Sequence, residues 1–152
     1  MDVSHPSNKK VIAYFSKRNP DAALVLLPEE STRDPYMSLG SHPDIVSRIW
    51  KDINAELDSD CRLILCGTPA LVHPVTGMIL AVALGTQYCL HLPVPLMEAA
   101  LAAGVKTTTK WSGGRVTDVA SEFGDGWIFG KWLNDEIGWC REAYQFFGHT
   151  GN

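Results

Sequence analysis

The sequence lacks a hydrophobic run long enough to cross a membrane. Its longest apolar stretch, Met78–Leu84, falls far short of the ~18 residues that a span needs. The polar N-terminal stretch MDVSHPSNKK also lacks the apolar segment of a secretory signal. We therefore expect a cytoplasmic protein without a membrane partner. Repeats and low-complexity linkers are also missing, so the 152 residues predict a single globular domain, residues 1–152, with flexible ends at 1–10 and 149–152.

A basic surface and a cysteine pattern are missing as well. The net charge is -4 and the lysines and arginines are scattered, which argues against nucleic acid as a partner because such binding needs a basic face. The four cysteines contain no pair separated by two residues. In the cytoplasm they are expected to be reduced thiols. No cofactor is predicted from these features.

The stretch Cys61–Pro93 alternates apolar runs with turn residues, and this pattern predicts four consecutive strands. The predicted turns lie at residues 67–69, 74–77 and 85–86. Connections this short join antiparallel neighbours, so the strand order should follow the chain. Met78–Leu84 is apolar on both faces, with small alanines on one of them. Both faces of this strand are therefore expected to be covered.

Three helices are predicted around this meander. Pro43–Leu57 has an apolar stripe and follows Ser41, the expected N-cap. Pro95–Ala103 is short and ends at Gly104. The closing helix, Asn134–Phe147, has Asp135 and Glu136 at its start, where acidic side chains favour the helix dipole. Its predicted buried stripe leaves out Trp139 and consists of Leu133, Ile137, Cys140, Tyr144 and Phe147.

Several shorter segments complete the predicted fold. Val11–Phe15 and Ala22–Leu27 are expected as strands, and Pro28–Gly40 as a loop. Val105–Trp111 and Arg115–Val119 should form a second hairpin. The predicted fold class is α+β: an antiparallel β-meander sheet with two main amphipathic helices and one short helix packed on it. Many small bacterial binding, accessory and inhibitor proteins share this layout, but a layout alone carries no function.

The late tryptophans are the leading functional signal. Trp111, Trp127, Trp132 and Trp139 lie among lysines and arginines in the last 42 residues, and tryptophan and arginine often anchor protein interfaces. The predicted binding surface consists of Trp111, Arg115, Trp127 and Lys131. The leading hypothesis is a non-catalytic protein-binding module, an inhibitor, immunity-type or accessory protein, whose partner is another protein. The competing interpretation is that most of these rings pack the helix against the sheet.

Two alternatives remain open. Cys66, His73, Cys89 and His91 lie in or beside the predicted meander and could form a zinc site or a Cys–His nucleophile pair. That arrangement requires His91 to pair with Val82 across the turn, and a register slip would destroy it. The other alternative is a sensor that holds a small apolar molecule between sheet and helix, in a pocket of a few hundred cubic ångströms.

Overall fold

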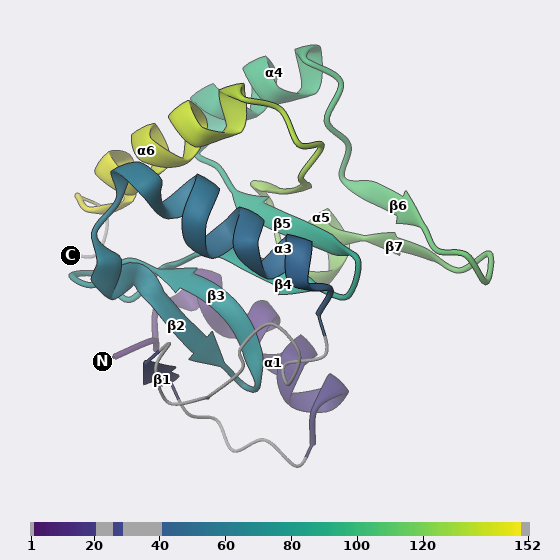
Figure 1. The fold of residues 1–152 in the computed structure, drawn as a ribbon, viewed down its shortest axis with the longest axis horizontal. Coiled ribbons are helices and arrows are strands. Elements are labelled where there is room, and N and C mark those ends of the chain that lie inside the picture. Colours follow the sequence, from purple (N-terminus) through teal and green to yellow (C-terminus); the bar gives the residue numbers. More distant parts are fainter. Residues whose placement is uncertain (1, 21–25, 29–40, 150–152) are drawn as a thin grey trace.

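The computed structural model describes residues 2–20, 26–28 and 41–149, and shows an α+β fold (Figure 1). Its main sheet has six antiparallel strands in the order β1-β2-β3-β4-β5-β8, and β6 and β7 form a separate two-stranded sheet. The strands are β1 (Leu26–Pro28), β2 (Arg62–Leu65), β3 (Thr68–Val72), β4 (Ile79–Leu84), β5 (Gln87–His91), β6 (Thr108–Lys110), β7 (Val116–Asp118) and β8 (Trp127–Phe129). The main helices are α1 (Lys9–Arg18), α3 (Pro43–Ser47), α4 (Val94–Ala102), α5 (Val119–Glu122) and α6 (Asp135–Phe147).

The predicted meander is confirmed as strands β2 to β5, each paired with the next. The first turn is tighter than expected, because Thr68 and Pro69 already belong to β3 and pair with β2. At the next turn, the His73 N–H donates to the Met78 carbonyl at 2.8 Å. The glycine-broken stretch 123–130 contributes β8, which pairs with β5 at the edge of the sheet.

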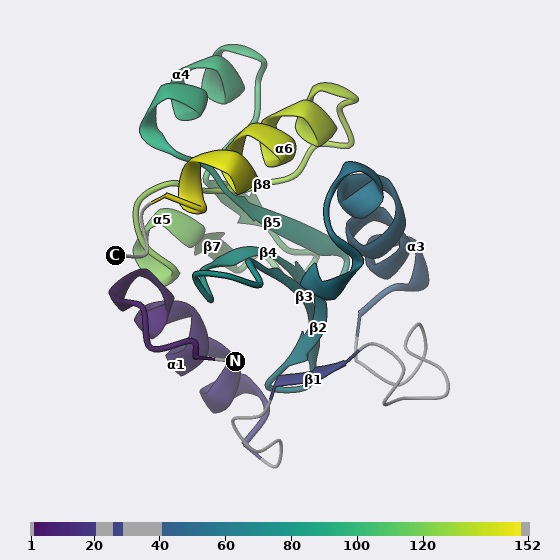
Figure 2. The ribbon, with the colours of Figure 1, turned by 90° about the vertical axis from the view of Figure 1, so that its left-hand side faces the viewer.

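Helices cover both faces of the main sheet (Figure 2). On one face the helical segment 43–56, α4 and α6 bury a cluster that includes Trp50, whose indole N–H donates to the Ala70 carbonyl at 3.1 Å. Ala81 and Ala83 belong to this cluster, and small side chains allow the helix to approach the strand closely. On the other face α1 and α5 bury a second cluster around Phe15 and Val82.

The first predicted helix forms, but its cap differs from the expectation. His42, not Ser41, is the N-cap, and its Nδ1 accepts a hydrogen bond from the Asp44 N–H at 3.1 Å. The reason is Pro43, which disfavours helical backbone at the residue before it; His42 is accordingly extended, with ψ 137°. After α3 the helix continues as a π-helical turn, η3 (Arg48–Asp52), and a 3-10 turn, η4 (Ile53–Glu56).

The N-terminal segment corrects the prediction of a strand at Val11–Phe15. These residues belong to α1, whose buried face carries Val11 and Phe15, one helical turn apart. A short apolar run fits both the period of a helix and the period of a strand, and packing against the second cluster decides between them. Residues 6–10, expected to be flexible, are helical, and buried Asn8 donates to the Gly77 carbonyl at 2.8 Å. The predicted loop at 29–40, residues 22–25 of the second strand and the tail 150–152 lie outside the described residues.

The closing helix α6 buries a different stripe from the one predicted. Trp139 is buried and Glu136 is completely buried, whereas Ile137 and Tyr144 are only partly covered. Glu136 was predicted only to lie at the positive end of the helix dipole. The stripe is rotated because Glu136 has buried partners on other elements, which periodicity cannot reveal.

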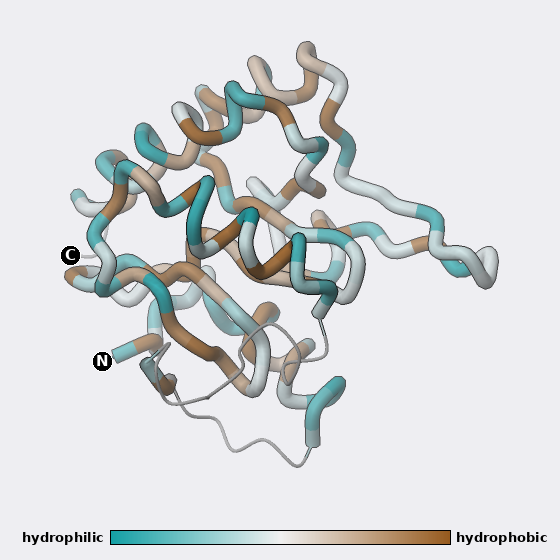
Figure 3. Tube along the Cα trace, viewed as in Figure 1, coloured by the Kyte–Doolittle hydropathy of each residue, from teal (hydrophilic) through white to brown (hydrophobic). Residues whose placement is uncertain are grey.

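The predicted second hairpin is confirmed as β6 and β7, which extend away from the body of the protein (Figure 1). Figure 3 shows few hydrophobic residues along it. Helix α4 also lies at the surface, with Val94 and Leu101 exposed. None of the described helices is long and apolar enough to span a membrane.

A substitution at Gly130, which follows β8, tests the packing at this edge of the main sheet. A Cβ at Gly130 would overlap the ring of fully buried Tyr88. We expect Gly130→Ala to lower the free energy of unfolding by about 2 kcal/mol or more, because overpacking forces the ring or the backbone to move. Urea denaturation measures this change. Gly113→Ala is the control, since nothing lies within 4 Å of its Cβ, and a loss of similar size there would contradict the explanation.

Candidate functional site

A buried carboxylate connects the start of α6 to three other parts of the chain. Glu136 has no exposed surface. Its Oε1 accepts hydrogen bonds from the Tyr88 hydroxyl of β5 and, at 3.1 Å, from Nη2 of Arg48 in η3. Its Oε2 accepts from the backbone N–H of Lys131 at 2.7 Å. Both oxygens are therefore satisfied, which a buried carboxylate requires.

Arg48 is the cation of this network. Its Nη2 also donates to the Leu133 carbonyl at 2.6 Å, and its Nη1 lies 3.4 Å from Oδ2 of Asp52. Burial by itself would lower the pKa of Arg48, but hydrogen bonds and charge from Tyr88 and Glu136 outweigh burial and raise it. Burial raises the pKa of Tyr88, and Glu136 adds to that shift. Tyr88 is therefore a neutral phenol between two charged groups.

Trp132 is the exposed member of the site. Its backbone has φ +62°, the left-handed region that bulky residues avoid. Its N–H donates to the Tyr88 hydroxyl at 2.8 Å, and its ring meets the Tyr88 ring edge-on at 5.5 Å between centroids. The Arg48 guanidinium lies 5.4 Å from the indole centroid, within cation–π range. The indole is nonetheless 51% exposed.

This network positions the side chain of Trp132, and its polar groups do not form a reaction centre. Tyr88 and Glu136 are fully buried and Arg48 is 5% exposed, so the polar groups are not within reach of a substrate. A candidate acid or base must come within hydrogen-bond distance of its substrate. The network instead holds residues 130–133 in a conformation that presents the Trp132 ring to solvent.

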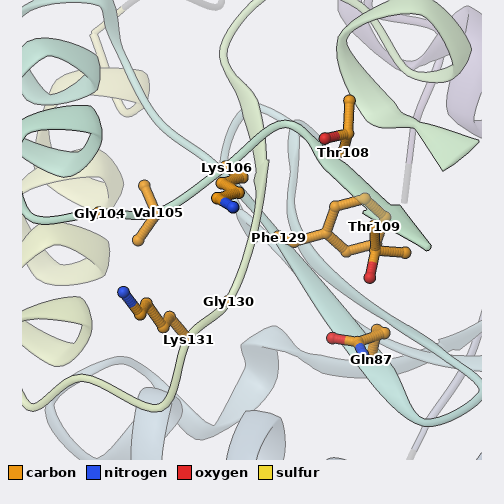
Figure 4. A pocket seen from close by; sticks show the side chains of 9 residues that line it. All are labelled: Gln87, Gly104, Val105, Lys106, Thr108, Thr109, Phe129, Gly130 and Lys131. Carbon is orange, nitrogen blue, oxygen red and sulfur yellow. The ribbon is translucent and has the colours of Figure 1, made fainter. Parts of the chain in front are cut away.

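A hollow lies beside the same loop, and Gly130 and Lys131 line it. Figure 4 shows it between the end of α4, the segment leading into β6, and β8. Its volume is about 260 Å³, and Lys106 and Lys131 both line it. Lys131 extends toward Gly104 (Figure 4), whereas the ring of the next residue, Trp132, lies over Arg48. This hollow is not the predicted pocket between sheet and helix.

The four residues of the predicted binding surface have different surroundings. Trp127 is 1% exposed and packs against Phe123 and His91, so its ring is not available at the surface. Trp111 is half-buried, and its indole N–H donates to Oγ1 of Thr117 at 2.7 Å. Arg115 is exposed on the hairpin, and Lys131 is exposed on the loop before α6.

Trp132 and its supporting network were not predicted as a site. Trp132 belongs to the late tryptophan cluster, but its position just before the helix also fits a local packing contact. Arg48 and Glu136 are 88 residues apart in the chain, and no local pattern pairs them. The one available signal is an aromatic residue two positions before the helix N-cap, and that signal is weak.

The histidines of the alternative Cys/His site have structural partners. His73 Nδ1 accepts hydrogen bonds from the backbone N–H groups of Val75 at 3.1 Å and Thr76 at 3.3 Å, and its ring stacks on Tyr144. His91 lies between Trp127 and Phe147, with ring centroids 4.9 and 4.6 Å away. Its Nδ1 lies 3.1 Å from the Ile79 carbonyl, a geometry in which Nδ1–H donates to that oxygen.

The register of β4 and β5 also differs from the one that this site required. Cys89, not His91, is opposite Val82. Cys89 is fully buried and burial raises its pKa, which disfavours the reactive thiolate. Cys66 is buried too, with Sγ 3.7 Å from the Ser16 hydroxyl oxygen. Within the described part of the chain, no three His, Cys, Asp or Glu side chains are grouped in a way that could hold a metal ion.

Comparison with known proteins finds no protein family that matches the chain, and no curated protein or solved structure with significant similarity to it.

Buried His91 predicts a loss of stability in mild acid. Burial lowers its pKa from 6.5 to about 4; the hydrogen bond to the Ile79 carbonyl opposes this shift, and a smaller effect from His5 adds to it. Between these two pH values the unfolded chain binds more protons than the folded one, so stability falls as the pH drops. The expected loss from this group is about 3 kcal/mol, measured by urea denaturation between pH 7 and 4.

The matched variant for this prediction is His91→Phe, which keeps an aromatic ring between Trp127 and Phe147 but cannot titrate. It loses the bond to Ile79, so it should be about 1 kcal/mol less stable at pH 7. Its stability should fall less between pH 6.5 and 4 than that of the wild type. Equal pH profiles for the two proteins would show that His91 does not cause the loss.

The ion pair of the network can be tested by a double-mutant cycle. Glu136→Gln leaves the Arg48 charge buried, with the partly exposed Asp52 as its one remaining acidic partner among the described residues, and should cost about 3 kcal/mol. Adding Arg48→Met removes that charge, so the double variant should be more stable than the sum of the single effects predicts. Unfolding free energies at pH 7 measure the coupling, and strict additivity would refute it.

Proposed function

We propose that the protein is a non-catalytic protein-binding module, with Trp132 at the centre of its contact surface. The observation that carries this proposal is the half-exposed indole, held in a left-handed backbone conformation by a buried Arg48–Tyr88–Glu136 network. The partner is another protein that offers an apolar side chain or pocket to the ring. An inhibitor, immunity-type or accessory role fits such a module.

Energetics support a functional role for this tryptophan. A left-handed backbone at a bulky residue costs about 1–3 kcal/mol, and an exposed indole gives little of that back through burial. Glycine at this position would avoid the backbone cost. Strain of this kind is found preferentially at functional sites, where the surrounding structure maintains it. The π-helical turn that carries Arg48 is a second irregularity of a kind frequent at such sites.

Preorganisation supports the same proposal. The Trp132 ring contacts Tyr88 and lies over Arg48 in the free protein. Binding a partner would therefore cost less conformational entropy than ordering a mobile ring. Tryptophan is the residue most enriched among the side chains that dominate binding energies. An ordered, half-exposed indole is therefore suited to act as an anchor.

The test compares the wild type with Trp132→Ala and with Val75→Ala. Val75 is also exposed, at 80%, but lies in the β3–β4 turn, so its variant controls for the loss of an exposed apolar side chain. The three immobilised proteins are incubated with extract of the cells that naturally produce the protein. Captured polypeptides are quantified by mass spectrometry, and the affinity of the purified partner is measured by calorimetry.

We expect a polypeptide to bind the wild type and Val75→Ala with equal affinity. Trp132→Ala should bind it at least about 30-fold more weakly, which corresponds to about 2 kcal/mol for a central anchor. Urea denaturation should show that Trp132→Ala remains folded, since its ring is half exposed. A folded Trp132→Ala protein that binds the partner as tightly as the wild type would refute the proposal.

A further inference from the structure

The hollow shown in Figure 4 is lined by two lysines and, among the described residues, by no acidic side chain. Lys106 and Lys131 line it, and its lining residues include no aspartate or glutamate. Within the described residues neither ammonium group takes part in a hydrogen bond or ion pair. Two unpaired cations beside one hollow raise the local concentration of small anions and favour binding one of them.

The other lining groups suit an organic anion better than a bare ion. Gln87, Thr108 and Thr109 offer amide and hydroxyl groups that can bind ligand oxygens. Phe129 adds an aromatic ring that is almost completely covered by the protein elsewhere, with 4% exposure. The ring therefore leaves little surface for a ligand, and the convergent polar groups of the hollow define the kind of molecule that it can bind.

Gly104 keeps space open for one of the cations. Its backbone has φ +96°, and a Cβ at this position would lie 2.8 Å from Nζ of Lys131. Any other residue would therefore strain the backbone and displace the ammonium group. The backbone of Lys106 is held beside the hollow, because its carbonyl accepts a hydrogen bond from the Phe129 N–H at 2.9 Å. The fold thus sets the backbone position from which this lysine extends.

Two other hollows bounded by described residues lack this combination. The one beside α1 contains Lys10 and Lys17 but also Glu122, and Nζ of Lys10 donates to the Ser121 carbonyl at 3.3 Å. The one at the N-terminus contains a single lysine together with Asp2. A carboxylate near a lysine competes with an anionic ligand, so these hollows are poorer anion sites.

We propose that the hollow lined by Lys106 and Lys131 binds a small organic anion with a carboxylate or phosphate group. The two ammonium groups bind the anionic group, and the rest of the ligand contacts Gln87, Thr108 and Thr109. The volume of about 260 Å³ suits a metabolite-sized molecule, since drug-sized ligands occupy larger pockets. This inference does not rest on the proposed protein-binding surface, because Trp132 is not among the residues that line the hollow.

The test is a titration of ¹⁵N-labelled protein followed by NMR. The probes are phenyl phosphate, benzoate and inorganic phosphate, which separate a phosphate head group from a carboxylate and show whether the ring contributes. We expect saturable shifts of the backbone amides of residues 104–109 and 129–131 with phenyl phosphate or benzoate. Inorganic phosphate should bind more weakly, because it contacts fewer of the residues that line the hollow. Binding should weaken as salt is added.

The matched variants are Lys106→Gln/Lys131→Gln and Lys10→Gln/Lys17→Gln, which change the net charge equally. The first should weaken phenyl phosphate or benzoate binding at least about tenfold, and the second should leave it nearly unchanged. Lys106→Gln alone serves if the double variant is unstable. Absence of saturable shifts up to about 10 mM of every probe, a dissociation constant too weak for a specific site, would overturn the proposal. Equal weakening in both double variants would also overturn it.

Discussion

The burial of Glu136 is the constraint on which the helical face of this protein depends. A carboxylate without water must receive hydrogen bonds from the protein, and its donors come from η3, β5 and the loop before α6. One side chain therefore fixes the position of α6 relative to both the sheet and the helical segment 43–56. Removing it would leave Arg48 with a buried charge and would release the loop that carries Trp132.

The loop before α6 connects the two proposed surfaces. Glu136 binds the backbone N–H of Lys131, and Tyr88 binds that of Trp132. With the backbone held at two successive residues, the side chains diverge: Lys131 extends toward Gly104 at the end of α4, and Trp132 lies over Arg48. The same network thus supports the backbone of both the aromatic anchor and one of the lysines that line the hollow.

The two-sided covering of the main sheet explains why several candidate residues have structural surroundings. Cys89 and Trp127 face the cluster under α1 and α5, and His91 is enclosed between Trp127 and Phe147. A histidine in this setting is kept neutral by burial, which lowers its pKa. The buried histidine makes the stability of the core sensitive to acid. The aromatic rings around it are not partners for a catalytic reaction. The residues that remain available for recognition lie on connections between elements, where binding residues are commonly found.

The sequence by itself determined the meander, the second hairpin and the positions of the two main helices, because short turns and apolar periodicity are local properties. It could not decide whether Val11–Phe15 forms a strand or a helix, since the run fits both periods and only packing against the second cluster distinguishes them. It also could not place Trp127 inside and Trp132 outside. That distinction depends on pairing β8 with β5 and on an ion pair between residues 88 positions apart. Contacts of such separation form only when the whole chain folds, so tertiary structure alone decided the candidate site.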